Sequence, residues 1–254
     1  MKNITATIQV RMGSSRLPGK VMRRIMGKPL LGHLISRIQK CKLLDNIIVA
    51  TSTNKENDVM ELYCKDNNIP YFRGDEDDVL GRMLDSLLSV NSEVGVEVFG
   101  DCPLIDPRIV DMVIQKFLDN TNLDFIGNDL KTTFPPGMEV EVFKVSALED
   151  SHKRTKDPNI REHGTLYIRQ NPQIYNIENL EAPKKWSRPE LAMEVDTEED
   201  ISVVTKVIEY FESKGIDNFT IGDIIDFMDD NPKIRKLNAT IPRRWKKFRE
   251  SGNV

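Results

Sequence analysis

Cysteine is scarce in this sequence, and long apolar runs are missing. Cys41, Cys64 and Cys102 stand far apart in a chain of 254 residues, with no CxxC pair. An odd number of isolated cysteines suits neither a disulfide framework nor a thiolate zinc site, so we expect reduced thiols in a cytoplasmic protein. No stretch approaches the roughly 20 apolar residues of a membrane span, and the apolar run at the N-terminus is too short for a signal peptide. We therefore expect no membrane partner.

An excess of positive charge is also missing. The chain has 36 Lys and Arg against 40 Asp and Glu, a net charge of −4. General nucleic-acid binders need surplus cations to neutralise phosphates, so we expect no nucleic-acid partner, although a local anion site remains possible. The 39% hydrophobic content is enough for one large core, and we expect residues 1–254 to form a single domain.

The first half of the chain alternates between strand and helix patterns. Asp106 has the position of a helix N-cap, with Pro107 at the first helical position. This alternation predicts an α/β fold of the Rossmann-like kind, a mainly parallel sheet with helices on both faces. The predicted strands are 4–10, 46–52, 69–74 and 94–100, and the predicted helices lie in 28–41, after 52, in 78–90 and from 107.

The pattern changes after about residue 125, where we expect a small β-containing insertion to about 190. Strands are predicted at 123–128, 138–148 and 191–197, and a helix at 158–172. Thr197 and Asp200 have the spacing of a capping box, which predicts that a helix begins there. The tail, 219–254, is predicted to be helical, and its basic cluster "RRWKKFR" is interpreted as a solvated surface.

The stretch "IQVRMGSSRLPGKVM" almost matches a phosphate-binding P-loop. Five residues separate Gly13 from the Gly19–Lys20 pair where that motif has four, and Val21 replaces the hydroxyl that would bind magnesium. The stretch follows the first strand directly, at the sheet edge where α/β proteins bind ligands. Small residues with exposed amides and the cations Arg11, Arg16 and Lys20 suit a triphosphate. A turn whose cations are merely solvated is the alternative.

Two aspartates follow predicted strands and could reach the same edge of the sheet. Asp101 comes after "VEVFG" and Asp196 after "LAMEV". Either could bind Mg²⁺, which prefers carboxylate oxygens, or could cap the next helix. His163, on the predicted helix 158–172, is by pattern alone a structural histidine.

The opening stretch and seven later segments resemble the sugar-acid cytidylyltransferases, the acylneuraminate and 3-deoxy-manno-octulosonate enzymes, and most of all the branch of spore coat polysaccharide biosynthesis protein F. The resemblance covers nearly the whole chain. It implies a nucleotidyltransferase that moves CMP from CTP to a sugar acid or related small acceptor, with Mg²⁺ as cofactor and a homodimer formed through the insertion. The later segments are "NIIVATSTNKEND", "YFRGDEDDVLGRM", "GDCPLIDP", "PPGMEVEVF", "REHGTLYIRQNP", "MEVDTEEDI" and "DNPKIRKLNA".

The resemblance also implies roles for single residues. It gives Arg11, Lys20 and Asp101 catalytic roles at the triphosphate, supported by Gly13, Ser14 and Arg16, with Mg²⁺ on Asp101 and Asp196. It places Arg73 and Arg82 on the nucleoside side, and Glu139, Glu141, Arg161 and His163 at the acceptor.

The sequence departs from the acylneuraminate enzymes at "QVRMGS", where they have "PARGGS", and at Cys102. Sialic acid itself is therefore not implied. Another nucleoside triphosphate, a phosphorylated or phosphonate acceptor, and a catalytically silent nucleotide-binding relative remain alternatives.

Overall fold

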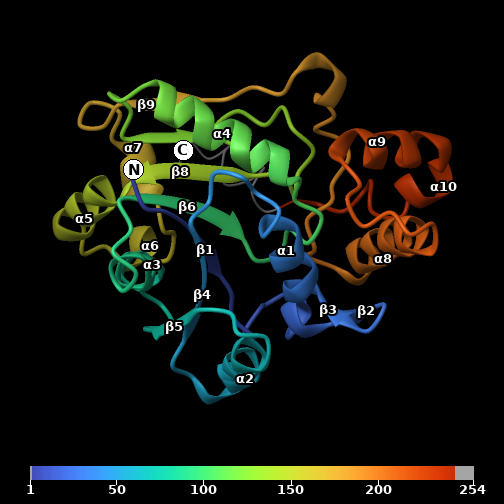
Figure 1. The fold of residues 1–254 in the computed structure, drawn as a ribbon, viewed down its shortest axis with the longest axis horizontal. Coiled ribbons are helices and arrows are strands. Elements are labelled where there is room, and N and C mark those ends of the chain that lie inside the picture. The colour runs from blue at the N-terminus through green and yellow to red at the C-terminus, as the bar shows by residue number, and fades with distance from the viewer. Residues whose placement is uncertain (1, 244–254) are drawn as a thin grey trace.

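The fold is organised around a seven-stranded sheet, shown in Figure 1. The structure, a computed structural model, describes residues 2–243. The strands run in the order β5 (Tyr71–Gly74), β4 (Asn46–Ser52), β1 (Ile4–Gln9), β6 (Val94–Phe99), β8 (Val140–Lys144), β7 (Phe125–Gly127) and β9 (Ile177–Asn179). Only β8 runs antiparallel to its neighbours. The expected mainly parallel sheet is confirmed. A separate hairpin joins β2 (Arg24–Ile25) to β3 (Lys28–Pro29).

Helices cover both faces of the sheet, as the sequence predicted. The helices α1 (Leu30–Ile38), α2 (Asp58–Asp66) and α4 (Pro107–Asp119) bury their apolar side chains in one cluster. The helices α3 (Val79–Leu88), α5 (Val145–Arg154) and α7 (Leu166–Gln170) form a second cluster. The helices α8 (Glu198–Ser213), α9 (Ile221–Asp230) and α10 (Pro232–Arg235) gather at one side of the sheet in Figure 1, and α6 (Pro158–Arg161) is a single turn.

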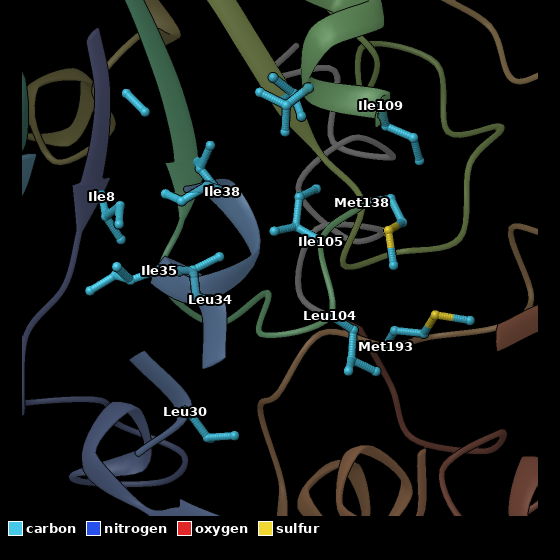
Figure 2. Close-up of a cluster of buried hydrophobic side chains, with 14 of the residues drawn as sticks. Ile8, Leu30, Leu34, Ile35, Ile38, Leu104, Ile105, Ile109, Met138 and Met193 are labelled. Atoms are coloured by element: carbon cyan, nitrogen blue, oxygen red, sulfur yellow. The ribbon is translucent and has the colours of Figure 1, made fainter. Parts of the chain in front are cut away.

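The central strands are buried on both faces but differ in chemistry from one face to the other. Ile4, Ala6 and Ile8 of β1 belong to the first cluster, and Figure 2 shows Ile8 beside side chains of α1. Alternate residues of a strand point to opposite faces, so Thr7 of β1 and Glu97 of β6 lie on the other face. Both are buried. One face of the sheet is thus a hydrophobic core, and the other carries polar groups into the interior.

Two helix starts form as the sequence predicts. The Asp106 side chain accepts a hydrogen bond from the Arg108 N–H at 2.9 Å, and Pro107 occupies the first turn of α4. Thr197 and Asp200 form a reciprocal capping box at the start of α8. Such caps satisfy the amide groups that a helix leaves unbonded at its N-terminus, so local side chains determine where these helices begin.

The second half of the chain requires corrections. Residues 191–197 do not form a strand, because the Met193 and Val195 amides bond to two different loops, at Pro136 and Asp101, instead of to one strand. The strand predicted at 138–148 ends at Lys144, and α5 begins at the next residue. The helix predicted over 158–172 is divided into α6 and α7.

The tail is helical in α9 and α10, but the basic cluster at its end is mostly outside the described residues. Its first residue, Arg243, is buried instead of solvated, because its guanidinium bonds to the Asp200 carboxylate at 2.7 Å. All three cysteines are free, so the chain has no disulfide framework, as expected. Within residues 2–243, no helix is long and apolar enough to cross a membrane.

Candidate active site

A cavity of about 890 Å³ opens where β1 and β6 end, a volume that can hold a small-molecule ligand. It lies at the carboxyl edge of the parallel strands, where the sequence placed the site. Gly13, Arg73 and Arg161 are not among the residues that line it. The predicted site residues that do line it are Arg11, Ser14, Arg16, Lys20, Arg82, Asp101, Glu139, Glu141, His163 and Asp196.

The loop of residues 11–20 folds back on itself after β1. The Ser14 and Gly19 amides both donate to the Met12 carbonyl at 2.9 Å, and the Met12 amide donates to Asn57 Oδ1 at 2.8 Å. Gly19 has a φ of 71°, a conformation in which residues with a Cβ are strained. This turn begins a short 3₁₀ helix at Lys20 and directs the Lys20 side chain into the cavity. Because the Ser14 and Gly19 amides are bonded within the loop, they are not presented to a phosphate as the amides of a P-loop are.

Lys20 joins the two aspartates that the sequence singled out. Its Nζ donates to Asp101 Oδ2 and to Asp196 Oδ1, both at 2.9 Å, and to the Val195 carbonyl at 2.6 Å. Arg16 forms an ion pair with the other oxygen of Asp196. The Val195 amide bonds to the Asp101 carbonyl at 2.9 Å, which fixes the two carboxylate-bearing segments together. Two cations and two carboxylates from three distant stretches of the chain therefore meet at one point.

The charges in this cluster balance. Burial by itself lowers the pKa of Lys20, but the attraction of Asp101 and then of Asp196 outweighs it, and the net effect raises that pKa. Lys20 is therefore cationic throughout the physiological range.

The same carboxylate pair fits a divalent cation. An ammonium ion bonded to both carboxylates shows that they converge on a position that stabilises positive charge. No group of three or more His, Cys, Asp or Glu side chains suited to a metal occurs among residues 2–243. Mg²⁺ is commonly held by one or two carboxylates together with substrate phosphates, so Asp101 and Asp196 suffice for that ion but not for an all-protein site.

The arginines predicted for the nucleoside side lie in different places. Arg82 is buried in the cavity wall, where its Nε donates to Gln9 Oε1 at 3.1 Å. Arg73 instead forms ion pairs with Asp58 and Glu61 at 2.7 and 2.5 Å, away from the cavity lining. Arg11 lies at the cavity edge, with Glu76 at 3.3 Å.

The two glutamates predicted for the acceptor are buried in the cavity wall. Glu139 accepts the Gly137 amide at 2.6 Å, and burial, then the nearby Glu194 carboxyl, raise its pKa to about 8. Glu141 bonds to Arg169 at 2.6 Å and to the Thr165 hydroxyl. Burial raises the pKa of Glu141 to about 7 in spite of the guanidinium. Both are therefore partly protonated near neutral pH.

The other two acceptor candidates differ in their surroundings. His163 lines the cavity, and burial lowers the pKa of its ring, so the ring stays neutral down to a lower pH than an exposed histidine does. Arg161 instead bonds to Asp78 at 2.5 Å and to the backbone carbonyls of His152 and Thr155, which fixes α6 to the start of α3.

Sequence reasoning missed several residues of this wall. Glu97 was detectable, because it is the only charge in the apolar strand "VGVEVF". The others come from turns and short helices whose positions no periodicity predicts. The missed residues are Glu97, Asp129, Thr165, Arg169 and Glu194.

Comparisons with known proteins identify the family. The family model described as "Cytidylyltransferase" matches residues 5–228. The chain is similar to spore coat polysaccharide biosynthesis protein SpsF of Bacillus subtilis, with 31% identity over 91% of this chain and 96% of that protein. The structure of a cytidylyltransferase from Leptospira borgpetersenii, 32% identical, superposes with a TM-score of 0.87 over 96% of this chain and 100% of the other. The 3-deoxy-manno-octulosonate cytidylyltransferase of Pelobacter propionicus is 32% identical over 48% of this chain and 47% of its own length.

Proposed function

The chain belongs to the cytidylyltransferase family and is a nucleotidyltransferase, and we propose that it moves CMP from CTP to a sugar acid or a related small acceptor. Pyrophosphate is the other product. The acceptor class is supported by the similarity to the octulosonate enzyme and to SpsF, whose name refers to spore coat polysaccharide. The product would serve the synthesis of surface polysaccharide or glycoconjugate.

The observation that carries this proposal is the position of Lys20 between Asp101 and Asp196. A triphosphate beside the loop of residues 11–20 would attract Lys20 and Arg16, and both carboxylates would then be released to hold Mg²⁺. Bound there, Mg²⁺ would supply charge neutralisation to the phosphate oxygens. The cluster thus contains the groups that the proposed complex needs.

The reaction would be an in-line displacement at the α-phosphorus of CTP. A bond forms between the acceptor oxygen and the α-phosphorus, and the bond from that phosphorus to the bridging oxygen of the β-phosphate breaks. An acceptor hydroxyl loses its proton to solvent, whereas an ionised acceptor has none to lose. Lys20 and Arg11 would stabilise charge on the departing pyrophosphate. Positioning and charge stabilisation account for most catalysis in reactions of this type.

A pyrophosphate-release assay tests the proposal. The enzyme is supplied with Mg²⁺, each of the four nucleoside triphosphates, and a panel of sugar acids and phosphorylated acceptors, and the product is identified by mass. We expect turnover with CTP and a CMP-linked product. Phosphate release without an acceptor would indicate a hydrolase, and CTP binding without any product would indicate a silent nucleotide-binding protein.

A further inference from the structure

Glu97 is a buried acidic residue in the cavity wall. It is only 5% exposed and it lines the cavity wall. Within the described residues, its carboxyl group has no hydrogen bond and no ion pair. Buried polar groups are nearly always hydrogen-bonded, because an unpaired one loses its hydration without compensation. A buried carboxyl group without a partner, facing a ligand cavity, indicates that the ligand supplies the partner.

The neighbours of Glu97 compensate it only in part: the charges of Arg169 and Arg82 lower its pKa, but within the described residues neither side chain forms a hydrogen bond or an ion pair with it. Glu97 of β6 lies directly opposite Glu141 of β8 in the antiparallel register. The nearby cation Arg169 is shared between Glu141 at 2.6 Å and Asp129 at 3.0 Å. Arg82 directs its Nε to Gln9 and its Nη1 to two backbone carbonyls. Like charges directly opposite each other destabilise a sheet, so this pairing is unfavourable without a further cation.

Carboxyl groups also gather in the part of the cavity wall around Glu97. Burial, and then the Glu141 carboxyl, raise the pKa of Glu97 well above its usual range. The carboxyl group of Glu97 therefore tends to hold its proton, and a cation placed beside it by a ligand would favour its ionised form. The carboxyl groups that line this part of the cavity are those of Glu97, Asp129, Glu139, Glu141 and Glu194.

The backbone packs closely beside Glu97, at a position where a side chain would not fit. Gly164 lies between α6 and α7, and a Cβ built there would come within 3.2 Å of Glu97 Oε2 and within 2.4 Å of Met83 Cε. The backbone at Gly164 thus approaches the carboxyl closely without a side chain to cover it.

We propose that the acceptor carries a protonated primary amine that binds against the Glu97 carboxylate. This proposal rests on the transferase function proposed above and specifies its acceptor class as an amine-bearing one. Glu97 then determines acceptor specificity, because its carboxylate pairs with the ammonium group of the acceptor. The nucleotide end of the cavity does not take part in this choice.

The test compares three forms of one acceptor: 3-deoxy-manno-octulosonate, its analogue with a primary amine in place of the C8 hydroxyl, and the N-acetylated form of that amine. We expect kcat/KM for the amine to exceed that for either form without an ammonium group at least tenfold, with the difference mainly in KM. The substitution Glu97→Gln keeps the shape but removes the charge, and should reduce this preference at least tenfold. The matched control is Glu93→Gln, at an exposed residue of the same segment, which should retain it.

Calorimetric titration with CTP separates this proposal from the general function. If the wild-type protein does not bind CTP, both the transferase function and the amine assignment are overturned. CTP binding together with equal use of all three acceptors, or with an unchanged preference in Glu97→Gln, would overturn the amine assignment alone. If no form is turned over, binding of the amine to the enzyme–CMP complex that Glu97→Gln abolishes supports the proposal. Absence of that binding refutes it.

Discussion

Replacing Lys20 by alanine tests the charge cluster most directly. The change removes the ammonium that lies 2.9 Å from both Asp101 and Asp196. Asp196 keeps Arg16, whereas Asp101 loses its only ion pair within the described residues. Loss of one preorganised charge contact typically lowers turnover on the order of 100-fold, or about 2.7 kcal/mol, and we expect at least that effect on kcat/KM.

The same substitution should also affect stability, by a smaller amount. A carboxylate that loses a charged partner costs about 1–3 kcal/mol. Because the Asp101 side chain is 32% exposed and solvent screens it, we expect the lower end of that range. For a protein of this size this corresponds to a fall in Tm of roughly 2–4 °C.

Pyrophosphate release should therefore be measured well below the Tm of the variant, so that the lower rate reports chemistry and not unfolding. The matched control is Lys153→Ala, which removes a lysine whose side chain is 67% exposed on α5 and should change neither quantity. A folded Lys20→Ala enzyme with near-normal kcat/KM would refute the catalytic role of Lys20.

Three further outcomes follow from the geometry. Asp196→Asn should lower turnover on the order of 100-fold and weaken the Mg²⁺ dependence of the rate, and a Mg²⁺ titration of pyrophosphate release that matches the wild type would contradict this. Arg73→Ala should leave kcat/KM within about threefold, because its ion partners lie outside the cavity lining and surface pairs contribute about 0–1 kcal/mol. The pKa of Glu139 is raised from 4.5 to about 8, so the folded state holds its proton longer than the unfolded state. That contribution to stability is complete below about pH 4.5 and is lost as the pH rises to about 8, so the fall in Tm over this window should be smaller in Glu139→Gln than in wild type.

The parts of the fold that the sequence predicted are those set by local chemistry. Strand β4 forms at residues 46–52 as expected, because a β-branched run has one stable arrangement inside an α/β sheet. The start of α8 follows in the same way from Thr197 and Asp200, whose side chains bond to backbone amides within one turn. These signals need no information about distant residues.

The failures occurred where distant contacts decide the structure. Residues 191–197 have the composition of a strand, yet the neighbours available to them are two loops, so no ladder forms. The position of Asp196 at the cavity was nevertheless anticipated, because the segment still leads toward the end of β6. Arg73 lies in the predicted strand, but its side chain is held by two acidic groups of the neighbouring helix region, which no sequence pattern specifies.

The same difference between local and distant contacts applies to the candidate site. The loop of residues 11–20 could be identified because its cations are close together in sequence. The wall around Glu97 was predicted only in part: the resemblance implied Glu139, Glu141 and His163. The register between β6 and β8 places Glu97 opposite Glu141. The wall residues that were missed include Asp129, Thr165, Arg169 and Glu194, which come from turns and a short helix.

The reversed direction of β8 has a consequence for how this protein could diversify. Its first residues, not its last, lie beside the end of β6, with Val140 opposite Val98. The chain around it, residues 128–169, contributes Glu141 and Arg169 to the cavity wall, while residues 11–20 contribute a loop to another part of the lining. Two parts of the cavity lining are therefore encoded by separable stretches of the gene. Under the proposed function, exchanging residues 128–169 between relatives would change the surroundings of Glu97 while the loop of residues 11–20 is inherited unchanged.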